Sequence, residues 1–476
     1  MFNHTIMQGT IGQFVNCPYI YIYPLRKETI MSQTKTFTEG KILSPLIRFA
    51  LPVLFAMFLQ TMYGAVDMLV VGQFSDAAAV SAVSTGSWIM HSVTMGITAL
   101  SMGTTVLLGM RIGEGRRHEA GRVVGGSIAF FASIALAMTV IMFALAPTFA
   151  NMLHAPEEAF GETVSYIRIC ALGGLFIVAY NLIGSIFRGI GNSKLPLYSV
   201  IIACVLNIIG DLIFVGPLKM SANGAALATV ISQGISVVIS FFLIKKMGLP
   251  FDFSLKDIGF HKDIIKEVTG IGLPVAFQDV LVSISFLAIT AIVNSLGVVI
   301  SAGVGIAEKL CGFIMLVPSA FGQSMSAFVA QNIGARRPDR ARKALFYAIS
   351  VSFIVGVVMF YVSFFHGDIL SGIFSGESEV IHYSAEYLKS YAIDCLLTCF
   401  LFCFTGYFNG CGRTKFVMVQ GIIGAFAVRI PVSYLMSKIM PVSVFRVGLA
   451  TPCSTIVQII FCVTYFAMMN KKEKNA

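Results

Sequence analysis

The sequence predicts an all-α membrane protein with twelve transmembrane helices arranged as two pseudo-symmetric six-helix lobes. Three observations predict this fold: an apolar composition, basic residues gathered in alternate links, and an internal repeat. Of the 476 residues, 57% are hydrophobic and only 12% are charged, and the mean hydropathy is +0.84. This is more apolar surface than one water-soluble core can bury, so the chain belongs in a bilayer.

Apolar stretches between basic or glycine- and proline-rich links predict the individual helices. A membrane helix needs about 20 predominantly apolar residues to cross the hydrocarbon core. The 44 glycines and 15 prolines are tolerated in such helices, because small residues allow close helix packing. The expected spans are residues 46–71, 78–108, 123–150, 161–187, 195–216, 222–245, 268–296, 300–332, 343–369, 380–409, 415–440 and 446–469.

The distribution of Lys and Arg predicts the orientation of these spans. Most Lys and Arg residues lie at the two ends of the chain or in links that follow an even-numbered span. The odd-numbered links hold only Lys219, Lys438 and Arg446. Cytoplasmic loops carry an excess of basic residues, so both termini are expected in the cytoplasm. The net charge of +10 therefore reflects topology, and no nucleic-acid partner is expected.

The second half of the chain repeats the first at a shift of 221 residues, or 222 near the start of each half. Six spans is an even number, so both halves enter the membrane from the same side and form a parallel repeat. In transporters such halves rock about a central cavity. The aligned positions are Tyr166 with Tyr387, Phe187-x-Gly189-x-Gly191-x-x-Lys194 with Phe408-x-Gly410-x-Gly412-x-x-Lys415, and Leu51-Pro52 with Leu273-Pro274.

The repeat divides the chain into an extension, two lobes, a linker and a tail. The extension has no long apolar run and no cleavable signal pattern, and we expect it to be disordered. Because Met31 opens a plainer start, we hypothesise that residues 1–30 are not translated, which mass spectrometry of the native N-terminus would test. The segments are the N-terminal extension 1–40, the N-lobe 41–245, the cytoplasmic linker 246–267, the C-lobe 268–469 and the cytoplasmic tail 470–476.

Asp67, Asn207 and Asp211 are the main candidates for chemistry inside the membrane. Ionisable side chains are costly within a bilayer, so each is a functional candidate by default. Asn207 and Asp211 are four residues apart and share one helix face, Asp67 lies one turn beyond Tyr63, and Thr229 adds a hydroxyl. Their oxygens can hold a small cation such as Na⁺, or the two acids can share a proton. Both alternatives stay open.

The second half does not repeat this set. At a shift of 221, Asn207 and Asp211 align with Val428 and Val432, and Arg429 stands beside them. The two halves are therefore expected to differ in chemistry. The remaining charged candidates for a substrate, gating or structural contact are Asp279, Glu308 and Asp394.

No enzyme signature is present. The sequence lacks GxxxxGK[ST], HExxH and GxSxG motifs, so it predicts neither an enzyme nor a bound cofactor. The ten cysteines form no CxxC pair, and neither a disulfide scaffold nor a zinc site is expected. Without a nucleotide-binding domain, transport must be driven by an ion gradient or by a partner chain.

Residues 41–469 resemble the multidrug and toxic compound extrusion (MATE) family, in particular the bacterial branch typified by the damage-inducible F protein. No single motif is specific, but their order across twelve spans is. The motifs that carry the resemblance are Leu51-Pro52, Val66-Asp67-x-x-x-Val71-Gly72, Phe187-Arg188-Gly189-x-Gly191, Asn207-x-x-x-Asp211 with Thr229, and Gln331-Asn332-Ile333-Gly334-Ala335.

This resemblance implies a V-shaped pair of lobes in the bacterial inner membrane that exports cationic amphiphilic drugs in exchange for Na⁺ or protons. It implies that Pro52 bends span 1 and that Asp67, Asn207, Asp211 and Thr229 hold the coupling ion, with Na⁺ at the first three. It also implies that Tyr166 lies beside this site, and Tyr63 is a further cavity candidate. A monomer is expected. Another branch has an acid in span 7, where this chain has Gln278-Asp279.

Two rival functions remain open. A flippase for lipid-linked oligosaccharides or lipid precursors of the same superfamily would need cationic residues in its cavity, and Arg429 is one such residue. A membrane scaffold or receptor that transports nothing would tolerate the loss of Asp67. Twelve spans with few bases inside them favour the exporter over the flippase.

Overall fold

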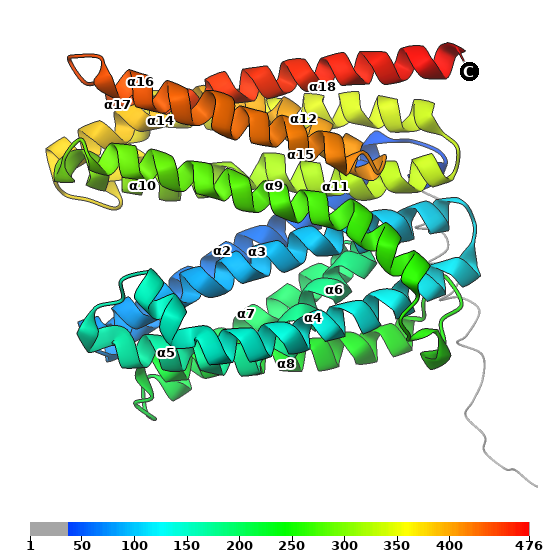
Figure 1. Cartoon of the computed structure of the whole chain (residues 1–476), viewed down its shortest axis with the longest axis horizontal. Helices are drawn as coiled ribbons and strands as arrows, with labels where there is room; N and C mark the ends of the chain where they lie inside the picture. Colours follow the sequence, from blue (N-terminus) through cyan, green and yellow to red (C-terminus); the bar gives the residue numbers. More distant parts are fainter. Residues whose placement is uncertain (1–36, 476) are drawn as a thin grey trace, which may run out of the picture.

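The computed structural model describes residues 37–475, and these are almost entirely helical (Figure 1). The proposed untranslated segment 1–30 lies outside the described residues. The helices of the first half are α2 Leu43–Phe74, α3 Ala77–Gly113, α4 Arg117–Met152, α5 Glu157–Leu172, α6 Gly174–Ile190, α7 Lys194–Phe214 and α8 Ser221–Met247. Those of the second half are η1 Leu255–Asp257, α9 Lys262–Asn294, α10 Val298–Ile314, α11 Leu316–Gly334, α12 Pro338–Phe365, α13 Gly367–Gly372, α14 Ser378–Gly410, α15 Thr414–Ile422, η2 Ile423–Arg429, α16 Ile430–Lys438, α17 Val444–Gly448 and α18 Ala450–Asn475.

The predicted all-α membrane fold is confirmed. Within the described residues, eleven helices are long and apolar enough to cross a membrane, and α5 with α6 adds a twelfth, bent span. In Figure 1 the helices α2–α8 form one bundle and α9–α18 form a second bundle beside it. The fold is therefore two six-span lobes in sequence order.

Span 4 is bent, whereas the sequence predicts one continuous helix over 161–187. α5 and α6 meet at 55° next to Gly173. A Cβ atom at Gly173 or Gly174 would crowd a side chain of α8 or α4, so the break is packed tightly. The Thr139 hydroxyl of α4 donates to the Ala171 carbonyl at 2.9 Å, which provides a partner for a carbonyl at the break.

Span 11 contains a π-helical turn at Ile423–Arg429. A π-turn adds one residue relative to an α-helix, so the alignment of the two halves changes from a shift of 221 to one of 222 across it. The burial pattern follows this change, because Arg429 and Ser433 are buried as Asn207 and Asp211 are. The alignment of Asn207 and Asp211 with two valines is therefore wrong by one residue.

The two lobes touch through backbone contacts between α3 and α11. A Cβ atom at Gly113 would overlap the Gln331 carbonyl oxygen, and one at Gly334 would overlap the Met110 carbonyl oxygen. Adding 221 to the residue numbers of one contact gives those of the other, so a pseudo-two-fold axis relates the two contacts. We call this end of the bundle, which also holds the C-terminus and the link 335–337, the basic end.

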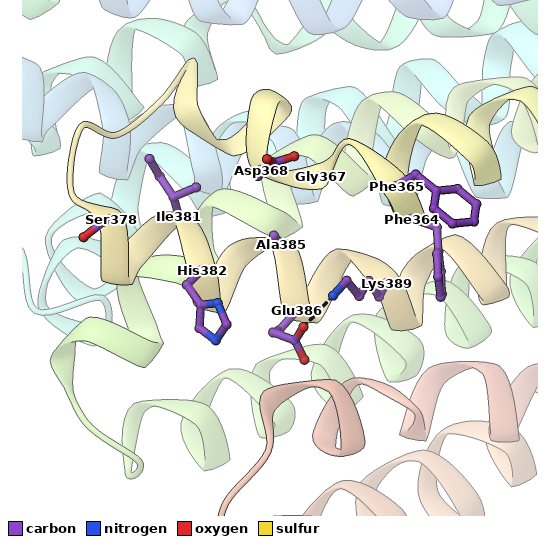
Figure 2. A pocket seen from close by; sticks show the side chains of 10 residues that line it. All are labelled: Phe364, Phe365, Gly367, Asp368, Ser378, Ile381, His382, Ala385, Glu386 and Lys389. Atoms are coloured by element: carbon purple, nitrogen blue, oxygen red, sulfur yellow. Dashed lines mark hydrogen bonds and ion pairs between the residues drawn. The ribbon is translucent and has the colours of Figure 1, made fainter.

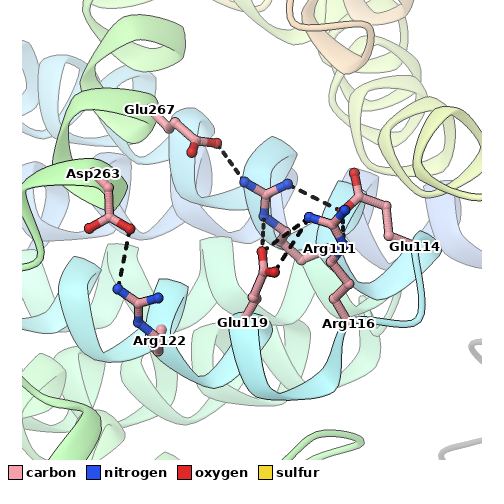
Figure 3. A network of polar contacts seen from close by, with 7 residues as sticks. All are labelled: Arg111, Glu114, Arg116, Glu119, Arg122, Asp263 and Glu267. Atoms are coloured by element: carbon pink, nitrogen blue, oxygen red, sulfur yellow. Dashed lines mark hydrogen bonds and ion pairs between the residues drawn. The ribbon is translucent and has the colours of Figure 1, made fainter.

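Ion pairs reinforce the same end of the lobe interface (Figure 3). Arg111, near the end of α3, binds Glu267 of α9 across the two halves, with 2.8 Å between Nη2 and Oε2. Arg122 of α4 pairs with Asp263 of α9 at 3.2 Å. Such partly exposed pairs contribute little each, about 0–1 kcal/mol, so they mainly determine which surfaces meet.

The segment just before α2 is ordered, which contradicts the expected disorder for residues 37–40. Phe37 is 3% exposed, and its ring packs against Phe49 of α2 and Phe328 of α11 at centroid distances of 5.2 and 5.0 Å. The Arg340 guanidinium of α12 donates to the backbone carbonyls of this segment. Its acceptors are Phe37, Glu39, Gly40 and Lys41, at 2.5–3.0 Å.

We expect Arg340→Gln to release this segment, because a glutamine cannot reach as many carbonyls as a guanidinium. Hydrogen bonds from charged donors contribute about 1.5–3 kcal/mol each when buried, and less here because the groups are partly exposed. Limited proteolysis should therefore cut near residues 37–41 roughly tenfold faster. Arg342→Gln is the matched control, since Arg342 binds Asp339, Asn470 and Glu473 instead. Equal cleavage rates in the two variants would contradict this role.

Candidate ion-binding site

Helices α2, α7 and α8 bring the predicted ion-site residues together. Asp67 is 5% exposed, Asn207 is 1% exposed and Asp211 is fully buried. The Asp67 carboxylate interacts with the side chains of both Asn207 and Asp211, although three membrane spans lie between them in sequence. Asn207 Nδ2 donates to Thr229 Oγ1 at 3.4 Å. The four residues therefore form one polar site inside the first lobe.

Several oxygens of this site have no hydrogen-bond partner among the described residues. They are Asp67 Oδ1, Asn207 Oδ1 and both carboxylate oxygens of Asp211. Buried polar atoms without a partner cost roughly 1–3 kcal/mol each, and an unpaired buried charge costs more. A proton shared by the acids or a small cation held by the hard oxygens would remove this cost. The arrangement suits either ligand.

Two tyrosines lie beside these carboxylates. Tyr166 of α5 is 2% exposed and interacts electrostatically with both Asp67 and Asp211. Tyr63 is partly buried one turn before Asp67 and interacts with it as well. Both were candidates from the sequence. Gly86 of α3 was not, yet its lack of a side chain is what lets the Tyr166 ring lie against the α3 backbone.

We expect Gly86→Leu to disturb the ion site without touching a carboxylate. A side chain there would overlap the Tyr166 ring, so the ring must leave its position beside Asp67 and Asp211. Cation binding by the purified protein should weaken by roughly tenfold, the effect of about 1.4 kcal/mol. Gly96→Leu is the control, because Gly96 is also in α3 and no atom lies within 4 Å of its Cβ position. Unchanged cation binding in Gly86→Leu would show that Tyr166 does not contribute to the ion site.

Pro52 lies within α2, which is one unbroken helix from Leu43 to Phe74 in this conformation. A proline removes one backbone hydrogen bond from a helix and weakens it there. Asp67 is on the same helix, about four turns further on. A bend at Pro52 would therefore move one wall of the site relative to α7.

The charged candidates of the second half lie apart from this site. Glu308 of α10 and Asp394 of α14 both act electrostatically on Cys311, so they form a separate buried cluster. The Thr290 hydroxyl donates to Glu308 Oε1 at 3.5 Å. Asp279 of α9 belongs to neither group, and its carboxylate binds no partner among the described residues.

A separate open cavity of about 420 Å³ lies between the end of α12, α13 and the start of α14 (Figure 2). Its charged walls include Asp368 of α13 and the ion pair of Lys389 with Glu386, 2.7 Å apart. None of the residues predicted for the ion site lines it. Within the described residues, no group of three or more His, Cys, Asp or Glu side chains could hold a metal ion.

Comparisons with known proteins agree with this architecture. The MatE family model matches residues 52–213 and 274–435, one match in each half. The chain is 26% identical over 402 residues to the probable multidrug resistance protein YpnP of Bacillus subtilis, covering 84% of this chain and 90% of that protein. It is 24% identical over 419 residues to the multidrug export protein MepA of Staphylococcus saprophyticus, covering 84% and 88%.

Solved structures share the fold. A multidrug resistance MATE family transporter of the MOP superfamily in an outward-facing conformation superposes with a TM-score of 0.86 at 19% identity, covering 93% of this chain and 98% of that chain. A MATE crystal structure in a straight conformation gives 0.87 at 19% identity, covering 93% and 99%. A MOP superfamily transporter from Pyrococcus furiosus, described as having a binding pocket of reverse polarity, gives 0.85 at 19% identity, covering 92% and 97%.

Proposed function

Because the chain belongs to the MATE family, we propose that it is a secondary active multidrug exporter that exchanges cationic amphiphilic drugs for Na⁺ or protons. The observation that carries the coupling is the buried set of Asp67, Asn207 and Asp211 with its unpartnered oxygens. Inside a bilayer no water is available to bind these oxygens, so the ion that drives transport is the ligand we expect for them. This role requires neither an enzyme activity nor a cofactor.

The proposed mechanism is alternating access between two lobes. The contacts of Gly113 and Gly334 close the basic end, which we assign to the cytoplasm from its excess of Lys and Arg. The conformation described here is then outward-facing. An ion from outside binds Asp67 and Asp211, α2 bends at Pro52, and the drug cavity shrinks as the drug leaves.

The carrier, now free of drug but holding the ion, then turns inward, releases the ion and binds another drug molecule. Coupling requires that ion and drug bind the two conformations with different affinities, since a ligand with equal affinities shifts no equilibrium. A bend at Pro52 meets this requirement, because it moves Asp67 relative to Asp211 and changes the ion site between conformations. We place the protein in the bacterial inner membrane as a monomer.

A flippase for lipid-linked precursors is the second candidate, and one observation favours it. Arg429 is a cation buried in the second lobe, where an anionic pyrophosphate would need one. The acids of the first lobe favour the exporter, as do the names of two relatives, a probable multidrug resistance protein and a multidrug export protein.

Dye transport into inside-out vesicles tests the proposal. Vesicles that hold the protein are given a fluorescent cationic dye and either a proton gradient or a Na⁺ gradient. Accumulation that depends on one gradient identifies the coupling ion and supports the exporter. No accumulation with either ion, from protein shown to be folded, would reject the exporter and favour a lipid-linked substrate.

A further inference from the structure

Arg429 occupies the place in the second lobe that Asn207 occupies in the ion site of the first. The π-turn η2 moves the alignment by one residue, which pairs Arg429 with Asn207 and Ser433 with Asp211. The burial of residues 205–215 matches that of residues 427–437 position by position. The two helices therefore present corresponding faces to the interiors of their lobes.

The other walls of the two sites correspond as well. At the shift of 222 that aligns Pro52 with Pro274, Asp67 corresponds to Ile289, which is 1% exposed. Tyr166 corresponds to Tyr387, and Tyr387 interacts with Arg429 as Tyr166 interacts with Asp67. The second lobe therefore keeps the shape of the site but replaces both carboxylates and gains a guanidinium.

The guanidinium of Arg429 is held firmly and far from water. It is 5% exposed, its Nη1 donates to Ser285 Oγ of α9 at 3.0 Å, and its Cζ lies 4.3 Å from the centroid of the Phe286 ring. Its Nε has no partner among the described residues. The Phe286 ring and the Ser285 hydroxyl position the guanidinium, but neither carries a negative charge that would neutralise it.

A carboxylate from a different helix balances this charge. Asp394 of α14 is 2% exposed, acts electrostatically on Arg429, and lies near the Thr455 hydroxyl. Within the described residues, no carboxylate oxygen of Asp394 lies within 4 Å of a guanidinium nitrogen of Arg429. The two charges therefore interact without forming a direct ion pair. The counterpart of Asp394 in the first lobe is Gly173, where span 4 is broken. The acid is therefore peculiar to the second lobe.

We propose that Arg429 is a tethered cation: it permanently supplies, at the counterpart of the ion site, the positive charge that a free ion supplies in the first lobe. The second lobe then binds no coupling ion, and each chain carries one exchangeable cation, at Asp67 and Asp211. This deepens the proposed function and rests on it. Removing the guanidinium would leave Asp394 without its counter-charge, and that carboxylate would recruit a proton or Na⁺ from solution.

Counting the cations bound by the purified full-length protein tests the proposal. Saturation binding of radioactive Na⁺ gives sodium sites per chain, and difference proton titrations in choline buffer give proton sites. Wild type and Arg429→Lys, which keeps the charge, should each bind one cation. Arg429→Gln should bind a second, a twofold increase, and Arg429→Gln with Asp394→Asn should return to one.

Two results would overturn the tethered cation. One is a wild type that binds two cations and loses one in Asp394→Asn; the other is Arg429→Gln with no added site in either titration. If wild type binds none while Arg429→Gln gains one, the ion coupling at Asp67 fails and the tethered cation stands.

Ser433→Asp keeps the test decisive if Arg429→Gln fails to fold. It restores the carboxylate of Asp211 at the corresponding position while leaving Arg429 in place. Arg429 would then face Asp394 and the new acid, the same ratio of two carboxylates to one cation as Asp67 and Asp211 with one ion, so Na⁺ and proton binding should stay at one. A second bound cation in Ser433→Asp would show that Arg429 does not act as the counter-charge of this site.

Discussion

Replacing Asp67 with asparagine is expected to abolish gradient-driven dye accumulation. The substitution keeps the size of the side chain and removes the charge that faces Asp211 and Asn207. Removing one partner of a buried charged site costs about 3–5 kcal/mol, and about 1.4 kcal/mol corresponds to a factor of ten. Ion affinity should therefore fall by more than about 100-fold. Dye uptake into inside-out vesicles under the driving gradient measures the effect.

The control for this prediction is Asp368→Asn. Asp368 is also an acid in a cavity, but it lines the cavity of Figure 2 between α12 and α14, away from α2 and α7. Its loss should leave accumulation unchanged. Dye binding in the absence of a gradient should survive in Asp67→Asn, because the proposal assigns this carboxylate to the ion and not to the dye. Full accumulation in Asp67→Asn would remove this site from the coupling mechanism.

The composition of the proposed ion site could be predicted because few residues in the spans carry charge. A carboxylate in a bilayer stands out, and the spacing of Asn207 and Asp211 places both on one helix face whatever the fold. The meeting of α2 with α7 then follows from the lobe architecture. This prediction depends only on residue type and local spacing, so it can be made from the sequence alone.

Backbone irregularities were not predictable in the same way. The bend at Gly173 and the π-turn at Ile423–Arg429 depend on what packs against the helix, and composition does not reveal packing partners. The π-turn mattered most, because one added residue replaced a valine with Arg429 at the counterpart of Asn207. The role of Gly86 could not be identified from the sequence for a related reason. Glycine is common in membrane helices, and only the Tyr166 ring packed against Gly86 shows why a side chain is excluded there.

Adding side chains at Gly113 and Gly334 is expected to prevent closure of the basic end and stop transport. A valine at either position would overlap a backbone carbonyl of the opposite lobe, which cannot rotate away as a side chain can. α3 and α11 must then separate. Overpacking of this kind costs about 1–3 kcal/mol per site. Two sites together are enough to make the closed basic end the minor conformation.

Spin labels measure this change directly. Labels at His118 of α4 and Lys343 of α12 lie on exposed positions at the basic end, one in each lobe, in a background where Cys17 and the exposed Cys453 are serine. The distance between them should lengthen in Gly113→Val with Gly334→Val, and drug uptake should fall with it. Gly96→Val, which adds the same side chain to α3 where nothing lies within 4 Å, should change neither.

Because the two glycine contacts are exchanged by the pseudo-two-fold axis, each single substitution should produce about half of the conformational free energy of the pair. The two positions also share one interface, so the effects need not add strictly. Gly113→Val and Gly334→Val should nevertheless shift the distance distribution in the same direction and to a similar extent. A large effect from one and none from the other would mean that the lobes do not separate about this axis, and that one helix moves alone.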